Sequence, residues 1–247
     1  FLSFAARATG TAAAAGAYVK AGLCRPKTRD EKGASALFRQ VADDPAAAKS
    51  APDAAASAFD QLHLLLLKQE KRPAREKLIA RCRKALPGHP VNARIAEREG
   101  DARLTAGASD KALDFYALAG AGLSGTGSNI VRLISVPKSG IFRQPLTQAD
   151  ADRLSAVASA RPACGLALCG LLSKRGDGWR AEDVRARIYT GQKRFAEAIA
   201  VWESLLKAGV GPADELGLVL AETRAFQLGD HARAAKDYGE WLTRFPS

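Results

Sequence analysis

One short pattern returns along the chain at intervals of 34 to 36 residues, and it constrains the fold more than any other feature. In its clearest copy, the turn Gly229-Asp230 precedes the small residue Ala234, the aromatic Tyr238 and finally Pro246. A small residue lets the two helices of a hairpin touch, an aromatic side chain fills the space beside it, and a proline cannot continue the helix. Each copy therefore predicts one helical hairpin, and repeated hairpins stack into an α-solenoid.

Three further copies precede this one. The pair of a small and an aromatic residue recurs at Ala198 and Trp202, 36 residues earlier, and again at Ala112 and Tyr116. The remaining copy begins 34 residues before Ala112 and has Leu78, Cys82, Ala85 and Pro90 in the matching places. The interval of 86 residues between Ala112 and Ala198 equals two periods plus an insertion.

This pattern resembles the tetratricopeptide repeat over residues 57–119 and 179–246. Gly100 occupies the place where the first helix of such a repeat carries a small residue. Members of that family hold peptides or helices of other proteins on a concave face. The resemblance implies a protein that works by binding, without a catalytic site, a cofactor, a metal or a small-molecule substrate.

Residues 205–214 are similar to the joint between pentatricopeptide repeats, a sister family that binds RNA with one base per repeat. In that family, polar side chains near the start of each first helix read the bases. The corresponding positions after Asp214 hold Leu216, Val219 and Leu220, which are all apolar. This departure weakens the case for base recognition.

The composition favours an all-α protein. Hydrophobic residues make up 47% of the chain and charged residues 26%, which is enough to build a core in a chain of 247 residues. Alanine is abundant and suits helices that pack closely, and few stretches alternate as strands do. We expect a basic N-terminal arm at 1–29, helical hairpins at 30–119, an irregular insertion at 120–147 and further hairpins at 148–247.

The insertion contains several local signals. Residues 120–125 match the glycine fingerprint of dinucleotide sites, but no strand–turn–helix unit surrounds them, so a flexible link is expected. Residues 130–136 are apolar enough for a short strand or one or two helical turns, and a loop follows as far as residue 146. Thr147 and Asp150 predict the start of a helix, and a second helix is expected at 162–173.

The net charge of +11 is concentrated in two segments. Residues 68–84 hold eight basic and two acidic residues, and residues 1–29 hold five basic residues and no acidic one. On a helix, Lys77, Arg81 and Lys84 form one stripe, while Leu78, Cys82 and Ala85 form the neighbouring stripe and should face the core. The basic residues of the arm are Arg7, Lys20, Arg25, Lys27 and Arg29. Both segments are predicted to contact an acidic partner, with a solvated helix face as the alternative for the stripe.

The same N-terminal segment bears on location. It is basic, free of acid and rich in small residues, as the remnant of a mitochondrial targeting segment is, and an ordinary basic arm is the alternative. The chain contains no methionine, so we expect a processed chain or a fragment. The uncharged residues 8–19 are too few to span a bilayer, which predicts a soluble protein or one in peripheral contact with a membrane.

The residues that usually carry chemistry do not form a recognisable site. The four cysteines and three histidines are Cys24, Cys82, Cys164, Cys169, His63, His89 and His231. Their spacing is not that of zinc ligands, and we expect the cysteines to be core or surface thiols. No serine lies between the glycines of a nucleophile elbow, and the carboxylates occur mainly beside basic residues.

The sequence therefore predicts a non-catalytic helical-repeat scaffold or accessory subunit that binds other protein subunits of a larger, mitochondrial assembly. The first alternative is an organellar RNA-binding protein of the pentatricopeptide type. A further alternative is a periplasmic scaffold of a bacterial envelope machine. The charge stripe and the arm are the predicted partner-binding residues in each case.

Overall fold

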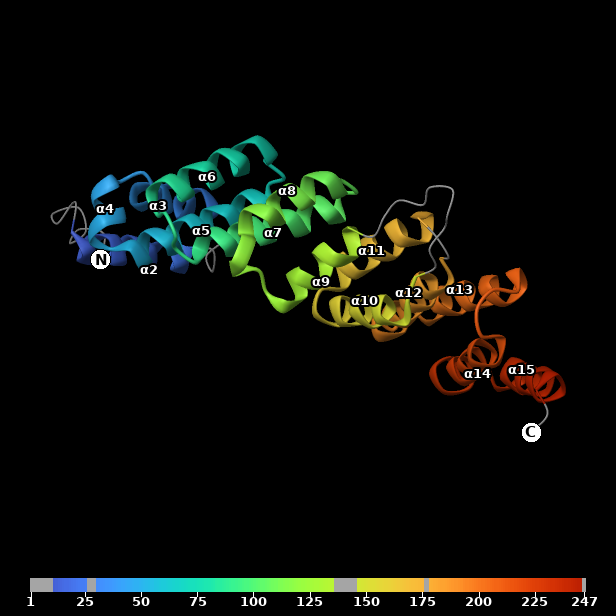
Figure 1. The fold of residues 1–247 in the computed structure, drawn as a ribbon. Coiled ribbons are helices and arrows are strands. Elements are labelled where there is room, and N and C mark those ends of the chain that lie inside the picture. Colours follow the sequence, from blue (N-terminus) through green and yellow to red (C-terminus); the bar gives the residue numbers. More distant parts are fainter. Residues whose placement is uncertain (1–10, 26–29, 136–145, 176–177, 246–247) are drawn as a thin grey trace. The chain divides into compact units, whose positions relative to one another are not determined.

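The computed structural model describes residues 11–25, 30–135, 146–175 and 178–245. These residues form helices joined by short turns and contain no strand, which confirms the all-α prediction (Figure 1). The chain divides into two compact units. The first comprises residues 1–102 and 114–123, and the second comprises residues 103–113 and 124–247.

In its described residues, the first unit contains five complete helices and most of a hairpin. The helices are α2 (Ala12–Cys24), α3 (Glu31–Ala42), α4 (Pro45–Ser50), α5 (Pro52–Lys68), α6 (Arg72–Ala85), most of α7 (Val91–Thr105) and the second half of α8 (Ser109–Ala119). A short 3-10 turn, η2 (Gly120–Gly122), follows α8. Helix α3 packs on α2 and α5, and α5 also packs on α6. One continuous apolar core joins these helices and includes Phe38, Phe59, Leu62, Leu78 and Ile95.

The prediction of an N-terminal arm is wrong for residues 12–24, because they form helix α2 within the first unit. Thr11 caps this helix by accepting a hydrogen bond from the backbone nitrogen of Ala14. Its small residues allow close packing on α3: a Cβ atom added to Gly22 would lie 2.5 Å from a ring carbon of Phe38. Val19 is buried on the same helix. The buried small residues Ala14, Ala15, Ala17 and Gly22 thus contribute to the core.

Helices α7 and α8 meet where a small residue of α7 lies against an aromatic ring of α8. A Cβ atom added to Gly100 on α7 would lie 2.9 Å from the ring of Tyr116 on α8. The Tyr116 hydroxyl donates a hydrogen bond of 2.7 Å to the carboxylate of Asp101. Because the ring is buried while its hydroxyl is bonded, the two helices are held at one register. Ala112 is fully buried.

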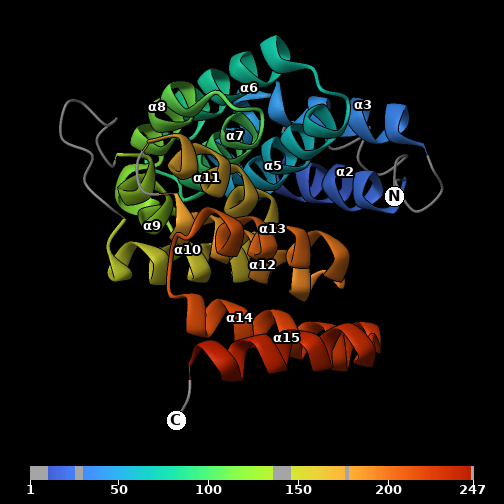
Figure 2. The ribbon, with the colours of Figure 1, turned by 90° about the vertical axis from the view of Figure 1, so that its right-hand side faces the viewer.

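The second unit begins with the end of α7 and the start of α8 and continues to the described end of the chain. Its further helices are α9 (Gly125–Ile134), α10 (Gln148–Ala160), α11 (Pro162–Arg175), α12 (Trp179–Gly191), α13 (Phe195–Ala208), α14 (Ala213–Glu222), the π-helical turn η3 (Thr223–Leu228) and α15 (His231–Arg244). Sequential helices pack in pairs from α10 to α15, and α10 also contacts α12. Figure 2 shows α14 and α15 lying side by side.

Helix α9 lies inside the segment that was expected to be irregular. Ser124 caps it by accepting a hydrogen bond from the Gly127 nitrogen, and Ile130, Leu133 and Ile134 are buried. The apolar residues thus recur at helical spacing and pack on α10 and α11, so neither a strand nor an irregular insertion describes them. The rest of the predicted loop, residues 136–145, lies outside the described residues.

The other helix signals of the second unit agree with the structure. Thr147 caps α10 by accepting a hydrogen bond from Asp150, and α11 covers the predicted residues 162–173. The small residues Ala198 and Ala234 are buried, and Trp202 is buried four residues after Ala198. The Trp202 indole nitrogen donates a hydrogen bond of 2.9 Å to Asp183 on α12. These contacts hold α12 and α13 together as one hairpin.

Candidate functional site

Helix α6 presents the predicted charge stripe to solvent. Lys77, Arg81 and Lys84 are all exposed, while Leu78 and Cys82 are buried in the core of the first unit. Ala85, the third residue expected to face the core, is half-buried and packs against it. The helical period therefore separates a charged face from an apolar face, as the sequence predicted.

Two residues of the stripe line a pocket of about 370 Å³ in the first unit, which we call the basic pocket. Helices α3, α4, α5 and α6 all contribute to it. Its apolar lining consists of Ala42, Pro45, Ala48, Phe59 and Ala85. Its charged lining consists of Asp43, Asp44, Lys49, Arg81 and Lys84. The combination of an apolar lining with a few charged groups is typical of binding pockets.

The charges of the basic pocket are only partly compensated. Arg81 forms an ion pair with Asp43, and the Asp44 carboxylate caps α4 by accepting a hydrogen bond of 2.8 Å from the Ala46 nitrogen. Lys49 and Lys84 are exposed and form no ion pair with any residue that the structure describes. Lys49 and Lys84 are therefore available to a ligand, and together with the carboxylate of Asp44 they give the pocket a net charge of +1.

The two described basic residues of the N-terminal segment, Lys20 and Arg25, do not line this pocket. Lys20 is exposed on α2, and Arg25 forms an ion pair with Asp30. Asp30 also caps α3 through a hydrogen bond from the Gly33 nitrogen, and this bond, together with Arg25, lowers the pKa of Asp30. Of the predicted arm, Arg7, Lys27 and Arg29 lie outside the described residues.

One member of the basic cluster has a different role, which the sequence did not reveal. Arg75 is 4% exposed and donates two hydrogen bonds to the fully buried Glu99, at 2.6 and 3.1 Å. The imidazole Nε2 of the buried His63 lies 3.3 Å from the same carboxylate. This buried ionic cluster joins α5, α6 and α7, and it holds the face of α6 that is turned toward the core. Arg75 adds nothing to the surface charge because Glu99 compensates it.

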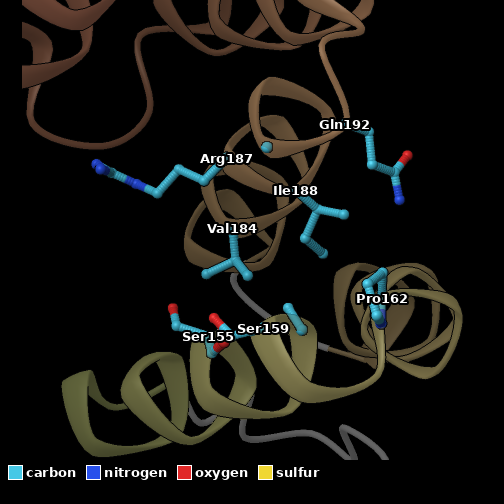
Figure 3. Close-up of a pocket in the computed structure, with 9 residues that line it drawn as sticks. Ser155, Ser159, Pro162, Val184, Arg187, Ile188 and Gln192 are labelled. Atoms are coloured by element: carbon cyan, nitrogen blue, oxygen red, sulfur yellow. Dashed lines mark hydrogen bonds between the residues drawn. The ribbon is translucent and has the colours of Figure 1, made fainter.

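A second pocket, of about 400 Å³, lies in the second unit between α10, α12 and the start of α11. Figure 3 shows Val184 and Ile188 extending from α12 toward α10, which carries Ser155 and Ser159. Arg187 is its charged lining residue, and its guanidinium lies 2.9 Å from the Asp183 carboxylate one turn away. This pocket therefore offers hydroxyl groups and apolar surface but no uncompensated cation.

The described residues offer no group of three or more histidine, cysteine or acidic side chains that could hold a metal ion. Cys82, Cys164 and Cys169 are buried, and Cys24 is exposed. Burial raises the pKa of Cys82 and of Cys169 to about 12, so both stay protonated thiols at neutral pH. A thiol in that state is a poor nucleophile.

No helix in the described part of the chain is both long and apolar enough to cross a membrane. No family model, no curated protein and no solved structure matches this chain. The resemblance to tetratricopeptide and pentatricopeptide repeats therefore stays a prediction.

Proposed function

We propose that this chain is a non-catalytic scaffold or accessory subunit of a larger assembly, and that it binds an acidic protein partner through α6 and the basic pocket. One observation carries the proposal. Lys77, Arg81 and Lys84 are exposed on a helix whose other face is fixed in the core, and two of them line a pocket with an apolar interior.

The exposed positive charges of α6 are concentrated on one face of the helix. Like charges that are concentrated on one face repel each other, and a partner of opposite charge removes that repulsion. The ion pair of Arg75 with Glu99 anchors the core-facing side of α6, so the backbone that carries the exposed charges is held in place. A rigid charged surface loses little conformational freedom on binding, which favours affinity.

The helical architecture supports a scaffold made of repeated hairpins. From α2 to α6 and from α9 to α15, helices that are neighbours in sequence pack on one another, and small residues lie buried at Gly22, Ala198 and Ala234. We infer that these hairpins are tetratricopeptide-like and form a solenoid. We also place the assembly in the mitochondrion, on the basis of the basic and acid-free segment 1–29.

An RNA-binding role is the second candidate, because the chain carries a net charge of +11. The residues at the positions that would read bases do not support an RNA-binding role. Leu216 and Leu220 are buried in the core of the second unit together with Trp202, and Val219 packs against that core. Such side chains cannot reach the Watson–Crick edge of a base, which RNA-reading modules contact.

The test is charge reversal on α6. Lys77→Glu with Lys84→Glu should slow binding to poly-L-glutamate, most strongly at low salt, because long-range attraction is screened beyond ~8 Å at physiological ionic strength. The matched control is Lys174→Glu with Lys207→Glu, which changes the same number of exposed charges in the second unit.

Polyuridylate serves as the competing ligand in the same measurements. If polyuridylate binds more tightly than polyglutamate, and its affinity falls steeply with salt as counterions are released, the chain is an RNA-binding protein. If both pairs of variants behave like the wild type with either polymer, the stripe is a solvated helix face and the proposal is wrong.

A further inference from the structure

The basic pocket has a feature that charge alone does not explain, namely an apolar interior between its charged groups. Five of its ten lining residues are alanine, proline or phenylalanine. A surface that recognised only carboxylates would need no such interior, since exposed lysines and arginines bind acidic groups in water.

We propose that the basic pocket takes one large apolar side chain from an acidic segment of a partner protein, with Lys49 and Lys84 binding carboxylates that flank this side chain. This inference rests on the proposed function and names the chemistry of the partner. The ligand is a short peptide stretch in which a leucine-like or phenylalanine-like residue stands among aspartates or glutamates.

The two lysines reach the pocket from different helices. Lys49 belongs to the short helix α4, and Lys84 lies near the end of α6. Both are exposed, and neither forms an ion pair with a residue that the structure describes. An apolar residue bound between α4 and α6 therefore has one cation on each helix available for an acidic neighbour. This arrangement provides the charge complementarity that selects an acidic segment.

Arg81 plays a different part from the lysines because Asp43 already neutralises it. Both residues line the pocket, so the carboxylate of Asp43 competes with any carboxylate of the ligand for the guanidinium. Removing the negative charge at position 43 releases Arg81 for the ligand. Asp43→Asn should therefore tighten the binding of acidic peptides. A substitution that only disturbed the fold would weaken binding instead.

A nucleobase is a poorer fit for the same interior. Its one aromatic residue, Phe59, is 1% exposed, so it offers almost no ring surface for stacking. The remaining apolar residues are alanines and a proline, whose side chains carry no hydrogen-bonding group to read a base edge. Proteins that bind single-stranded RNA usually provide aromatic side chains for stacking.

The experiment measures fluorescence anisotropy of labelled seven-residue peptides on the full chain. Each peptide has a central leucine, alanine or serine with three glutamates on each side of it. The leucine peptide should bind roughly tenfold or more tightly than the serine peptide, as expected for burying one large apolar side chain. Lys49→Glu with Lys84→Glu should weaken all three peptides.

Filling the pocket separates the apolar contribution from the charge. Ala85→Leu should abolish the preference for the leucine peptide and leave the serine peptide unchanged, whereas the control Ala80→Leu, at an exposed position of the same helix, should change neither. If Ala85→Leu lowers the melting temperature, Ala48→Leu fills the pocket from α4, and the exposed Ala46→Leu is its control.

The outcomes distinguish the two proposals. If all three peptides bind equally and charge reversal weakens them equally, the pocket does not hold an apolar residue, although the acidic-partner function stands. If no acidic peptide binds at all while polyuridylate does, both proposals are wrong. Weaker binding by Asp43→Asn would also overturn the role given to Arg81.

Discussion

Arg75 and Glu99 form a buried two-point ion pair between α6 and α7, with the Arg75 Nε atom 2.6 Å and an Nη atom 3.1 Å from the carboxylate oxygens. The pair lies on the core-facing side of α6, the helix that carries the candidate binding surface. Its two charges satisfy each other, so the loss of either would leave an uncompensated charge in the core.

The first prediction follows from this pair. Glu99→Ala should lower the free energy of unfolding by ~3–5 kcal/mol, because the Arg75 guanidinium would remain buried without its partner. Urea denaturation followed by circular dichroism measures the change. The control is Glu197→Ala, which removes an exposed ion pair with Arg194 and should cost less than ~1 kcal/mol. Equal effects of the two substitutions would contradict the buried pair.

The second prediction concerns pH. Burial is the main reason that the pKa of His63 is lowered from 6.5, so the folded protein binds its proton less readily than the unfolded chain does. Below pH ~6.5 the unfolded state therefore takes up more protons, and stability falls by at most ~1.4 kcal/mol per pH unit from this group. His63→Gln should reduce the loss of stability between pH 7 and pH 5.5. His231→Gln, at an exposed position, should leave that loss unchanged.

A third prediction tests whether α2 belongs to the core. Gly22→Ala should destabilise the protein by ~1–3 kcal/mol, because the new methyl group would overlap the ring of Phe38. On the same helix, Gly16 has no atom within 4 Å of an added Cβ. Gly16→Ala should therefore stabilise the protein by up to ~1 kcal/mol through helix propensity. Melting temperatures that move in the same direction would show that α2 does not pack as described.

A fourth prediction concerns the small residue of a hairpin. Ala198 is fully buried in the cluster that also contains Trp202 and Leu205, so Ala198→Leu should cost ~1–3 kcal/mol through overpacking. Ala196 is exposed on the same helix, and Ala196→Leu should change the unfolding free energy by no more than ~0.5 kcal/mol. An unchanged stability for Ala198→Leu would place the hairpin contact elsewhere.

The fifth prediction concerns the thiols. In the native protein at pH 8, an aromatic disulfide reagent should modify Cys24 quickly, while Cys82, Cys164 and Cys169 should react only after unfolding. Two of the buried thiols have a pKa of about 12, so almost no thiolate is present to react. Cys24→Ser should remove the rapid phase, and rapid modification of more than one thiol would contradict the burial.

The periodic parts of the fold could be predicted from sequence, because each helix carries its own local signals. The cap at Thr147, the buried Ala198 with Trp202, and the two faces of α6 all follow from helical spacing. Helix α2 was missed, since a run of alanines and glycines carries no apolar stripe of large residues. The need for a glycine at position 22 comes from Phe38, which lies on another helix.

The candidate site was predicted in part. The exposure of Lys77 follows from its place on α6, but the basic pocket depends on where α4 places Lys49, and no spacing in the sequence reveals that. The burial of Arg75 was equally hidden. Its partner Glu99 lies 24 positions away on another helix. A count of charges along the sequence therefore treats Arg75 as a surface residue.

The position of α2 has a practical consequence for anyone who shortens this protein. A chain that began at Asp30 would expose Phe38, which is fully buried when Gly22 and its neighbours cover the ring. Val19 of α2 and Val41 of α3 belong to the same apolar core, which would lose the part that α2 contributes. Since an uncovered apolar surface promotes aggregation, the shortened chain should precipitate or require detergent, although most of its helices would be intact.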